Sequence, residues 1–162
     1  MTNVTDSTVG QTSLYLEDLE PGRRFETASA VVARDAIKRF AADFDPQPFH
    51  LDEHAAEGSF FGGLVASGWH TAAITMRLLV TSGLPISGGV IGAGGELVWP
   101  KPVYPDDELT VAVEIVAAKR SASRPERGLV TVRCETRNQN GDVVQIMTAR
   151  LVVPARTASV TQ

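Results

Sequence analysis

Apolar residues recur at every second position through the last third of the chain. Positions 109, 111, 113 and 115 are apolar, and so are positions 130, 132 and 134, with polar or small residues between them. A period of two predicts strands that bury one face. The dipeptide Asn140-Gly141 precedes a further apolar stretch, 143–153, and is typical of a two-residue hairpin turn. This region therefore predicts antiparallel strands.

The first half of the chain has the apolar spacing of helices. In segment 34–45, apolar residues fall at i, i+3, i+4 and i+7, and Pro46 disfavours a helical residue before it. A second helix is expected over 65–81. It is apolar on almost every side, which predicts complete burial. A short surface helix is expected over 51–57 and a strand over 25–33, and the glycine-rich segment 84–95 is expected to be a loop that leads into a strand.

One buried helix followed by several strands predicts a single α+β domain, with the sheet curled around the helix. The domain is expected to span residues 14–154. Residues 1–13 are almost all polar or small and are expected to form a disordered tail, and residues 155–162 a loose C-terminal tail.

Composition narrows the functional class. The chain has 162 residues and a net charge of −4, and no basic stripe indicates nucleic-acid binding. The N-terminus lacks a signal-peptide pattern and no apolar run approaches the length of a membrane span, so we expect a soluble cytoplasmic protein. Cys134 is the single cysteine, which excludes a disulfide framework and a cysteine-based metal site.

Acid–base chemistry is indicated by Asp45 and His50, which flank a proline-stiffened loop just before the expected buried helix. An acid and a histidine differ in protonation near neutral pH, so the pair can divide the transfer of protons. The other candidates are weaker. Asp43 is expected to face solvent from the last helical turn, and His54 to be solvated on a short surface helix. His70 is expected to be a hydrogen-bonded structural histidine inside the buried helix.

The region 45–68 resembles the MaoC-like dehydratases, the family of the R-specific enoyl-CoA hydratases. The matching residues are Asp45, Pro48, Phe49, His50, Phe61, Gly62, Gly63 and Gly68. The sequence departs from the family pattern at Gln47, usually Asn, at Ser67, often His, and at Ala73, which is Ser in some members. The resemblance extends over residues 14–153 and implies a hot-dog fold and a homodimer whose pockets are lined by both chains.

The resemblance implies reversible hydration of a trans-2-enoyl thioester, catalysed by Asp45 and His50 without a metal, flavin or nicotinamide cofactor. Ser67, Gly68 and Trp69 are expected to contact the substrate, with the N–H of Gly68 binding the thioester oxygen at a helix N-terminus. Trp69 and Trp99 are either core residues or part of an acyl pocket.

Other interpretations stay open at this point. A hot-dog thioesterase would hydrolyse the thioester, and a non-catalytic acyl-thioester binder or dehydratase subunit would be consistent with the departures at Gln47 and Ala73. The cations Arg124 and Arg127 are expected either to hold the phosphates of coenzyme A or to form a solvated hairpin tip.

Overall fold

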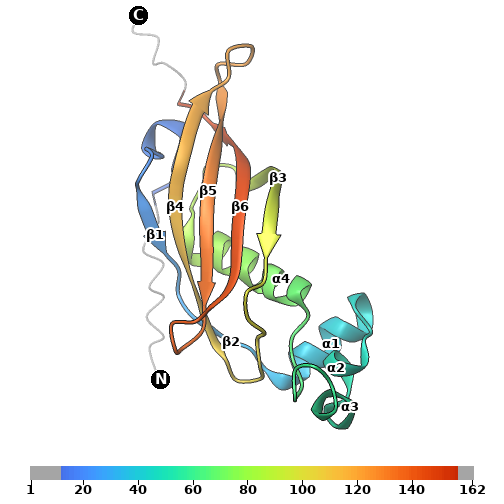
Figure 1. Ribbon diagram of the computed structural model, residues 1–162. Coiled ribbons are helices and arrows are strands. Elements are labelled where there is room, and N and C mark those ends of the chain that lie inside the picture. The colour runs from blue at the N-terminus through green and yellow to red at the C-terminus, as the bar shows by residue number, and fades with distance from the viewer. Residues whose placement is uncertain (1–11, 157–162) are drawn as a thin grey trace, which may run out of the picture.

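A six-stranded antiparallel sheet makes up the larger part of the molecule (Figure 1). The structure is a computed structural model that describes residues 12–156. Three long strands form the centre of the sheet, namely β4 (Glu108–Arg120), β5 (Arg127–Arg137) and β6 (Val143–Pro154). The short strand β1 (Arg24–Glu26) pairs with β4 at one edge, and β3 (Ile91–Val98) pairs with β6 at the other. The two-residue strand β2 (Ala30–Val31) pairs with the beginning of β4.

The alternation predicted for β4 and β5 is confirmed. One set of side chains is buried and the intervening set is half-buried or exposed, because successive residues in a strand point to opposite faces. The apolar side chains of the buried set are Leu109, Val111, Val113, Ile115, Val130, Val132 and Cys134.

The turn between β5 and β6 lies where it was predicted, but it is longer than two residues. It spans residues 138–142. The side-chain oxygen of Asn138 accepts hydrogen bonds from the backbone N–H groups of Asn140 and Asp142, both at 3.0 Å, and Gly141 adopts a φ of +78°. Asn138 therefore closes a wider loop than the Asn-Gly pair would form by itself.

Helix α4 (Gly68–Leu78) lies along the apolar face of the sheet, and a π-helical turn (Leu79–Gly83) continues it. Leu78 and Leu79 pack into the main core with the inward residues of the strands. The hot-dog arrangement expected from the resemblance is confirmed by this sheet wrapped around one central helix.

Complete burial of this helix was a wrong prediction for the single chain. The side chains of Trp69, Met76 and Val80 are 58%, 41% and 50% exposed. The sheet covers one face of α4. Trp69 and Met76 border a groove between this helix and the strands β3 and β6, and Trp69 contacts the ring of Trp99.

A group of short helices lies at one end of the sheet (Figure 1). Helix α1 (Arg34–Phe44) has the predicted limits and buries Ile37 and Ala41. The single helix expected over 51–57 is instead two, α2 (Pro48–Leu51) and α3 (Glu53–Glu57). Asp52 separates them because its side chain caps α3 by accepting a hydrogen bond from the N–H of Ala55 at 2.7 Å.

The glycine-rich segment leads into a strand as predicted, but the strand begins early and already includes residues 91–95. β3 begins at Ile91, and its pairing with β6 shifts register between Gly92 and Gly95. A Cβ atom on Gly95 would lie 2.6 Å from the carbonyl oxygen of Thr148, so the two strands can approach closely only with glycine at this position.

The ends of the described chain are tied to the domain. Leu14 is buried and forms a bridge with Ile86, after which a 3₁₀ turn (Leu16–Asp18) leads to β1. Ala155 is also buried, and Arg156 forms an ion pair with Asp18. The expected tails otherwise lie mainly outside the described residues. No helix within residues 12–156 is long and apolar enough to cross a membrane.

Candidate active site

Asp45 and His50 are brought together by a sharp change of chain direction after α1. Helix α1 ends one residue before Asp45, and α2 begins at Pro48, a favoured first helical residue because it has no N–H to leave unpaired. Between the helices, the N–H of Gln47 donates to the carbonyl of Asp45 at 2.7 Å. His50 Nε2 consequently lies 3.3 Å from Asp45 Oδ2. The bend expected in this loop is confirmed.

The second partner of His50 determines where its proton resides. His50 is buried, and its Nδ1 lies 2.7 Å from the carbonyl oxygen of Val65. A carbonyl only accepts hydrogen bonds, so Nδ1 carries the hydrogen, and Nε2 of the neutral ring is an acceptor. Nε2 therefore faces another acceptor, Asp45 Oδ2. A shared proton, or one water donating a hydrogen to each atom, satisfies both.

The carboxylate of Asp45 is held by two further side chains. Gln47 Nε2 donates to Oδ1 and Ser67 Oγ donates to Oδ2, both at 2.7 Å. The Ser67 hydroxyl is also the N-cap of α4, since its oxygen accepts a hydrogen bond from the N–H of Trp69 at 3.2 Å. The hydrogen bond from Ser67, with smaller contributions from Gln47 and His50, outweighs burial and holds the pKa of Asp45 below its usual value. Asp45 is therefore ionised at neutral pH.

A cavity of about 480 Å³ opens beside this pair. Its wall includes Asp45, His50, Gly68, Trp69 and Trp99, together with several apolar residues and Lys101. The indole of Trp99 lies against Gly68, where a Cβ atom would be 2.7 Å from Trp99 Cε2. Glycine is required here for the ring to approach the helix. The first N–H groups of a helix have no partner within it, so the beginning of α4 presents donors to this cavity.

The three residues expected to contact substrate at the head of α4 differ in access. Gly68 and Trp69 line the cavity. Ser67 is fully buried and is not part of the cavity wall, and its hydroxyl is already engaged by Asp45 and the N–H of Trp69. This geometry favours a role for Ser67 in holding Asp45 rather than in contacting substrate.

Arg124 and Arg127 lie far from Asp45 within the chain. They belong to the hairpin that joins β4 to β5, at the end of the sheet opposite the short helices (Figure 1). β4 has 13 residues, so its ends are about 40 Å apart at roughly 3.3 Å per residue. The structure does not bring these arginines into the Asp45–His50 cavity of the same chain.

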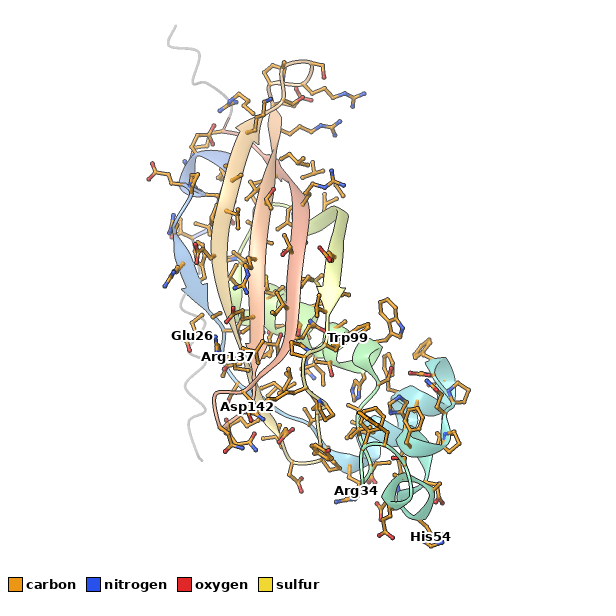
Figure 2. All side chains as sticks on the ribbon, viewed as in Figure 1. Glu26, Arg34, His54, Trp99, Arg137 and Asp142 are labelled. Carbon is orange, nitrogen blue, oxygen red and sulfur yellow. The ribbon has the colours of Figure 1, made fainter. Side chains whose placement is uncertain are left out.

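The remaining titratable candidates lie outside the cavity wall. Asp43 and His54 are exposed, and Figure 2 places His54 at the outer edge of the short helices. His70 is buried and stacks on Phe40 with ring centroids 4.8 Å apart, but its Nδ1 has no hydrogen-bond partner, contrary to expectation. Burial raises the pKa of the Cys134 thiol to about 12. Within residues 12–156, no three His, Cys, Asp or Glu side chains cluster to hold a metal ion.

Two contributions to the site were not anticipated from the sequence. In the sequence Gln47 is a departure from the family pattern, yet its amide donates directly to Asp45. Lys101 lines the cavity and pairs with Asp142 at 2.6 Å. The position of Gln47 inside the motif could have indicated its role, whereas nothing in the local sequence around Lys101 points to the cavity.

Similarity to known proteins agrees with this geometry. The MaoC like domain matches residues 18–138. The chain is 60% identical to a MaoC-like dehydratase of known structure from Rhodospirillum rubrum, with a TM-score of 0.88, over 90% of this chain and 100% of that one.

Two curated relatives are also similar. The uncharacterized protein YdeM of Bacillus subtilis is 42% identical over 78% of this chain and 89% of its own length. The (R)-specific enoyl-CoA hydratase of Rhodospirillum rubrum is 29% identical over 88% of this chain and 93% of its own length. With the family domain spanning most of the described residues and an Asp–His pair at the head of a central helix, the chain belongs to the MaoC-like dehydratase family.

Proposed function

We propose that this protein reversibly hydrates a trans-2-enoyl thioester to a 3-hydroxyacyl thioester. The observation that carries the proposal is the pair of acceptors, His50 Nε2 and Asp45 Oδ2, 3.3 Å apart beside the cavity. One water can donate a hydrogen to each of them while its oxygen lone pair stays free to attack. The similarity to an (R)-specific enoyl-CoA hydratase supports the same reaction.

The proposed reaction balances without any redox partner. The water oxygen bonds to C3 of the enoyl group as the Asp45–His50 pair takes one of its protons, and the pair returns a proton to C2. Charge that develops on the thioester oxygen is stabilised by the N–H of Gly68 at the beginning of α4. No electron leaves the substrate, so the proposal requires no flavin or nicotinamide, and the N–H of Gly68 takes the place of a Lewis-acid metal at the thioester oxygen.

An assay with trans-2-enoyl-CoA tests the proposal against the two alternatives. Hydration consumes the enoyl absorbance without releasing a thiol, and we expect this result. A thioesterase would release the thiol of coenzyme A from a saturated acyl-CoA, and a non-catalytic binder would do neither. Thiol release, or the absence of any enoyl consumption, would overturn the proposed function.

The active form is proposed to be a homodimer. β3 is an edge strand, and unpaired edges favour pairing with another chain. Ile91 and Val98 on this strand are 55% and 47% exposed, and the uncovered face of α4 lies next to it. Sedimentation of the active enzyme should give twice the mass of the chain. A fully active monomer would contradict this assembly.

Arg124 and Arg127 could bind the coenzyme A of a substrate only if they came from the hairpin of a second chain, because within one chain this hairpin lies far from the Asp45–His50 cavity. Replacing both Arg124 and Arg127 with Ala is expected to increase the KM for an acyl-CoA substrate modestly at low salt and to leave kcat unchanged. An unchanged KM would assign these arginines to a solvated hairpin tip.

A further inference from the structure

Three polar side chains meet inside the core between α4 and the sheet. Thr75 on α4, Thr136 on β5 and Gln145 on β6 are all fully buried, and Thr136 and Gln145 lie opposite each other in the sheet. Gln145 Nε2 donates to Thr75 Oγ1 at 3.0 Å, and Thr75 shares a 2.7 Å hydrogen bond with Thr136. Burying an amide is unfavourable unless its polar atoms are bonded. An apolar residue would therefore suit position 145 better if packing were its only role.

The other end of this network is the indole of Trp99. Its Nε1–H donates to Gln145 Oε1 at 2.9 Å. An indole nitrogen only donates, so the amide of Gln145 must present its oxygen to Trp99 and its NH₂ group to Thr75. Figure 2 places Trp99 where the chain leaves β3, beside α4. One buried amide therefore links a residue of the cavity wall to the central helix.

The hydrogen bond from Trp99 also determines how its ring lies against Gly68. A Cβ atom on Gly68 would be 2.7, 2.8 and 2.9 Å from Cε2, Cδ2 and Cζ2 of the indole. Cε2 is bonded to Nε1, so the ring atom closest to this position is next to the nitrogen held by Gln145. The χ2 torsion of a tryptophan is soft, and without the hydrogen bond the ring would be free to turn. Any such turn changes its contact with Gly68.

This arrangement holds α4 at two places on one side. Gly68 is the first residue of the helix, and Thr75 follows seven residues later, which is about two turns. Trp99 packs on Gly68, and Gln145 binds both Trp99 and Thr75. The N–H of Gly68 has no acceptor within the helix, because it belongs to the first turn. Its direction therefore depends on how the beginning of α4 is held.

We infer that Gln145 is a positioning residue, which acts through Trp99 to hold the N–H of Gly68 in place for the thioester oxygen. This inference rests on the proposed function. A donor stabilises the charge that develops on the oxygen only when it is already aimed at that atom. A small displacement of such a group is enough to slow a reaction.

Gln145→Met is the first test. Methionine has a similar length and volume but forms neither hydrogen bond, so it releases Trp99 and Thr75 without emptying the core. With crotonyl-CoA we expect kcat to fall by about tenfold while KM changes by less than about threefold, since the donor matters most in the transition state. A wild-type kcat would overturn the inference.

Trp99→Phe tests the route by which Gln145 acts. The substitution keeps an aromatic ring but removes the N–H, so it should also lower kcat. Adding Gln145→Met to Trp99→Phe should then lower kcat by less than about twofold more, because the hydrogen bond is already absent. A wild-type kcat in Trp99→Phe would overturn the inference, as would a full additional loss in the double variant.

Gln139→Met is the matched control for a purely structural loss. Gln139 also uses both ends of its amide: its Nε2 donates to Asp107 at 2.9 Å, and its Oε1 accepts from the N–H of Glu108 at 3.0 Å. It does not line the Asp45–His50 cavity. This variant should lose thermal stability but keep the wild-type kcat and KM. If it lowered kcat as much as Gln145→Met, the effect at position 145 would be structural and the inference wrong.

Nuclear magnetic resonance of the protein without substrate separates this inference from the proposed function. In Gln145→Met, the indole N–H of Trp99 should exchange with solvent at least about tenfold faster relative to that of Trp69, and the amide signal of Gly68 should shift. If these changes occur but no enoyl-CoA is hydrated, the hydratase proposal fails and the positioning of Gly68 stands. If enoyl-CoA is hydrated but the Gly68 signal of Gln145→Met matches the wild type, the hydratase proposal stands and the positioning role fails.

Discussion

His50 and His70 are both buried, at 5% and 8% exposure, but they lie in opposite chemical environments. His50 has a carbonyl on Nδ1 and a carboxylate facing Nε2, so each ring nitrogen faces a polar group. His70 stacks on Phe40, and its Nδ1 has no partner. Burial alone lowers the pKa of His70. The comparison shows that burial does not distinguish the two histidines, whereas polar partners and a place on the cavity wall do.

The largest expected loss of activity comes from replacing His50 or its partner Asp45. Asp45→Asn and His50→Ala should each reduce kcat/KM for an enoyl-CoA by roughly 10²–10⁴-fold, because each removes a group that takes or returns a proton. The double variant should fall to a similar residual rate, since the two side chains act on one water. Steady-state kinetics of the three variants measures this. Additive losses would mean that Asp45 and His50 act independently.

His54 provides the matched control for these substitutions. Its side chain is 98% exposed and pairs loosely with Glu57 at 3.8 Å. His54→Ala should retain wild-type kinetics. A loss comparable to that of His50→Ala would break the distinction between a partnered histidine at the cavity and a solvated one.

A smaller effect is expected from Ser67→Ala. Without the hydroxyl, the pKa of Asp45 should rise toward its usual value, because the hydrogen bond from Ser67 is the largest cause of its lowering. The proposed reaction needs the ionised carboxylate of Asp45, so the acidic limb of the kcat/KM profile should move to higher pH. The maximum rate should fall by roughly tenfold, since Asp45 is held less firmly. Loss of the N-cap should also cost about 1 kcal/mol of stability.

Ser82→Ala is the control for this variant. Ser82 lies in the π turn after α4, and its hydroxyl donates to Leu78 and accepts from the N–H of Ala28, away from Asp45. This variant should have the wild-type pH profile. If Ser67→Ala also kept the wild-type acidic limb, the link between Ser67 and the ionisation of Asp45 would be wrong.

The smallest expected effect is that of His70→Phe. The substitution keeps the stacking on Phe40 and removes the unpaired Nδ1, so stability at neutral pH should change by no more than about 1 kcal/mol. Catalysis should be unchanged. A loss of activity comparable to that of His50→Ala would place His70 in the catalytic machinery.

The same variant tests the pH dependence of stability. The pKa of His70 in the folded protein lies below its ordinary value of 6.5, so below that pH the unfolded chain binds more protons at this residue than the folded chain. The wild type should therefore lose stability as the pH falls from the ordinary value through the lower folded value. His70→Phe should lose less stability than the wild type over this pH range, as measured by thermal unfolding. Equal losses in both proteins would exclude His70 as the source.

The sequence by itself determined several local elements and the identity of the Asp45–His50 pair, which we propose to be catalytic. The limits of α1 followed from its apolar spacing and from Pro46, and β4 and β5 followed from their period of two, because these signals depend on residues a few positions apart. Asp45 and His50 were identifiable for the same reason, since one short loop carries both of them.

The tertiary structure decided what those residues contact. The carbonyl of Val65, which determines which nitrogen of His50 carries the proton, is 15 residues from His50 in the sequence. The hydroxyl that holds Asp45 is 22 residues from it. The side-chain amide that holds Trp99 is 46 residues from it. No periodic pattern encodes such pairs, because they form only when the sheet folds around α4. The apolar composition of α4 likewise indicates that the helix has packing partners, but not whether those partners belong to the same chain.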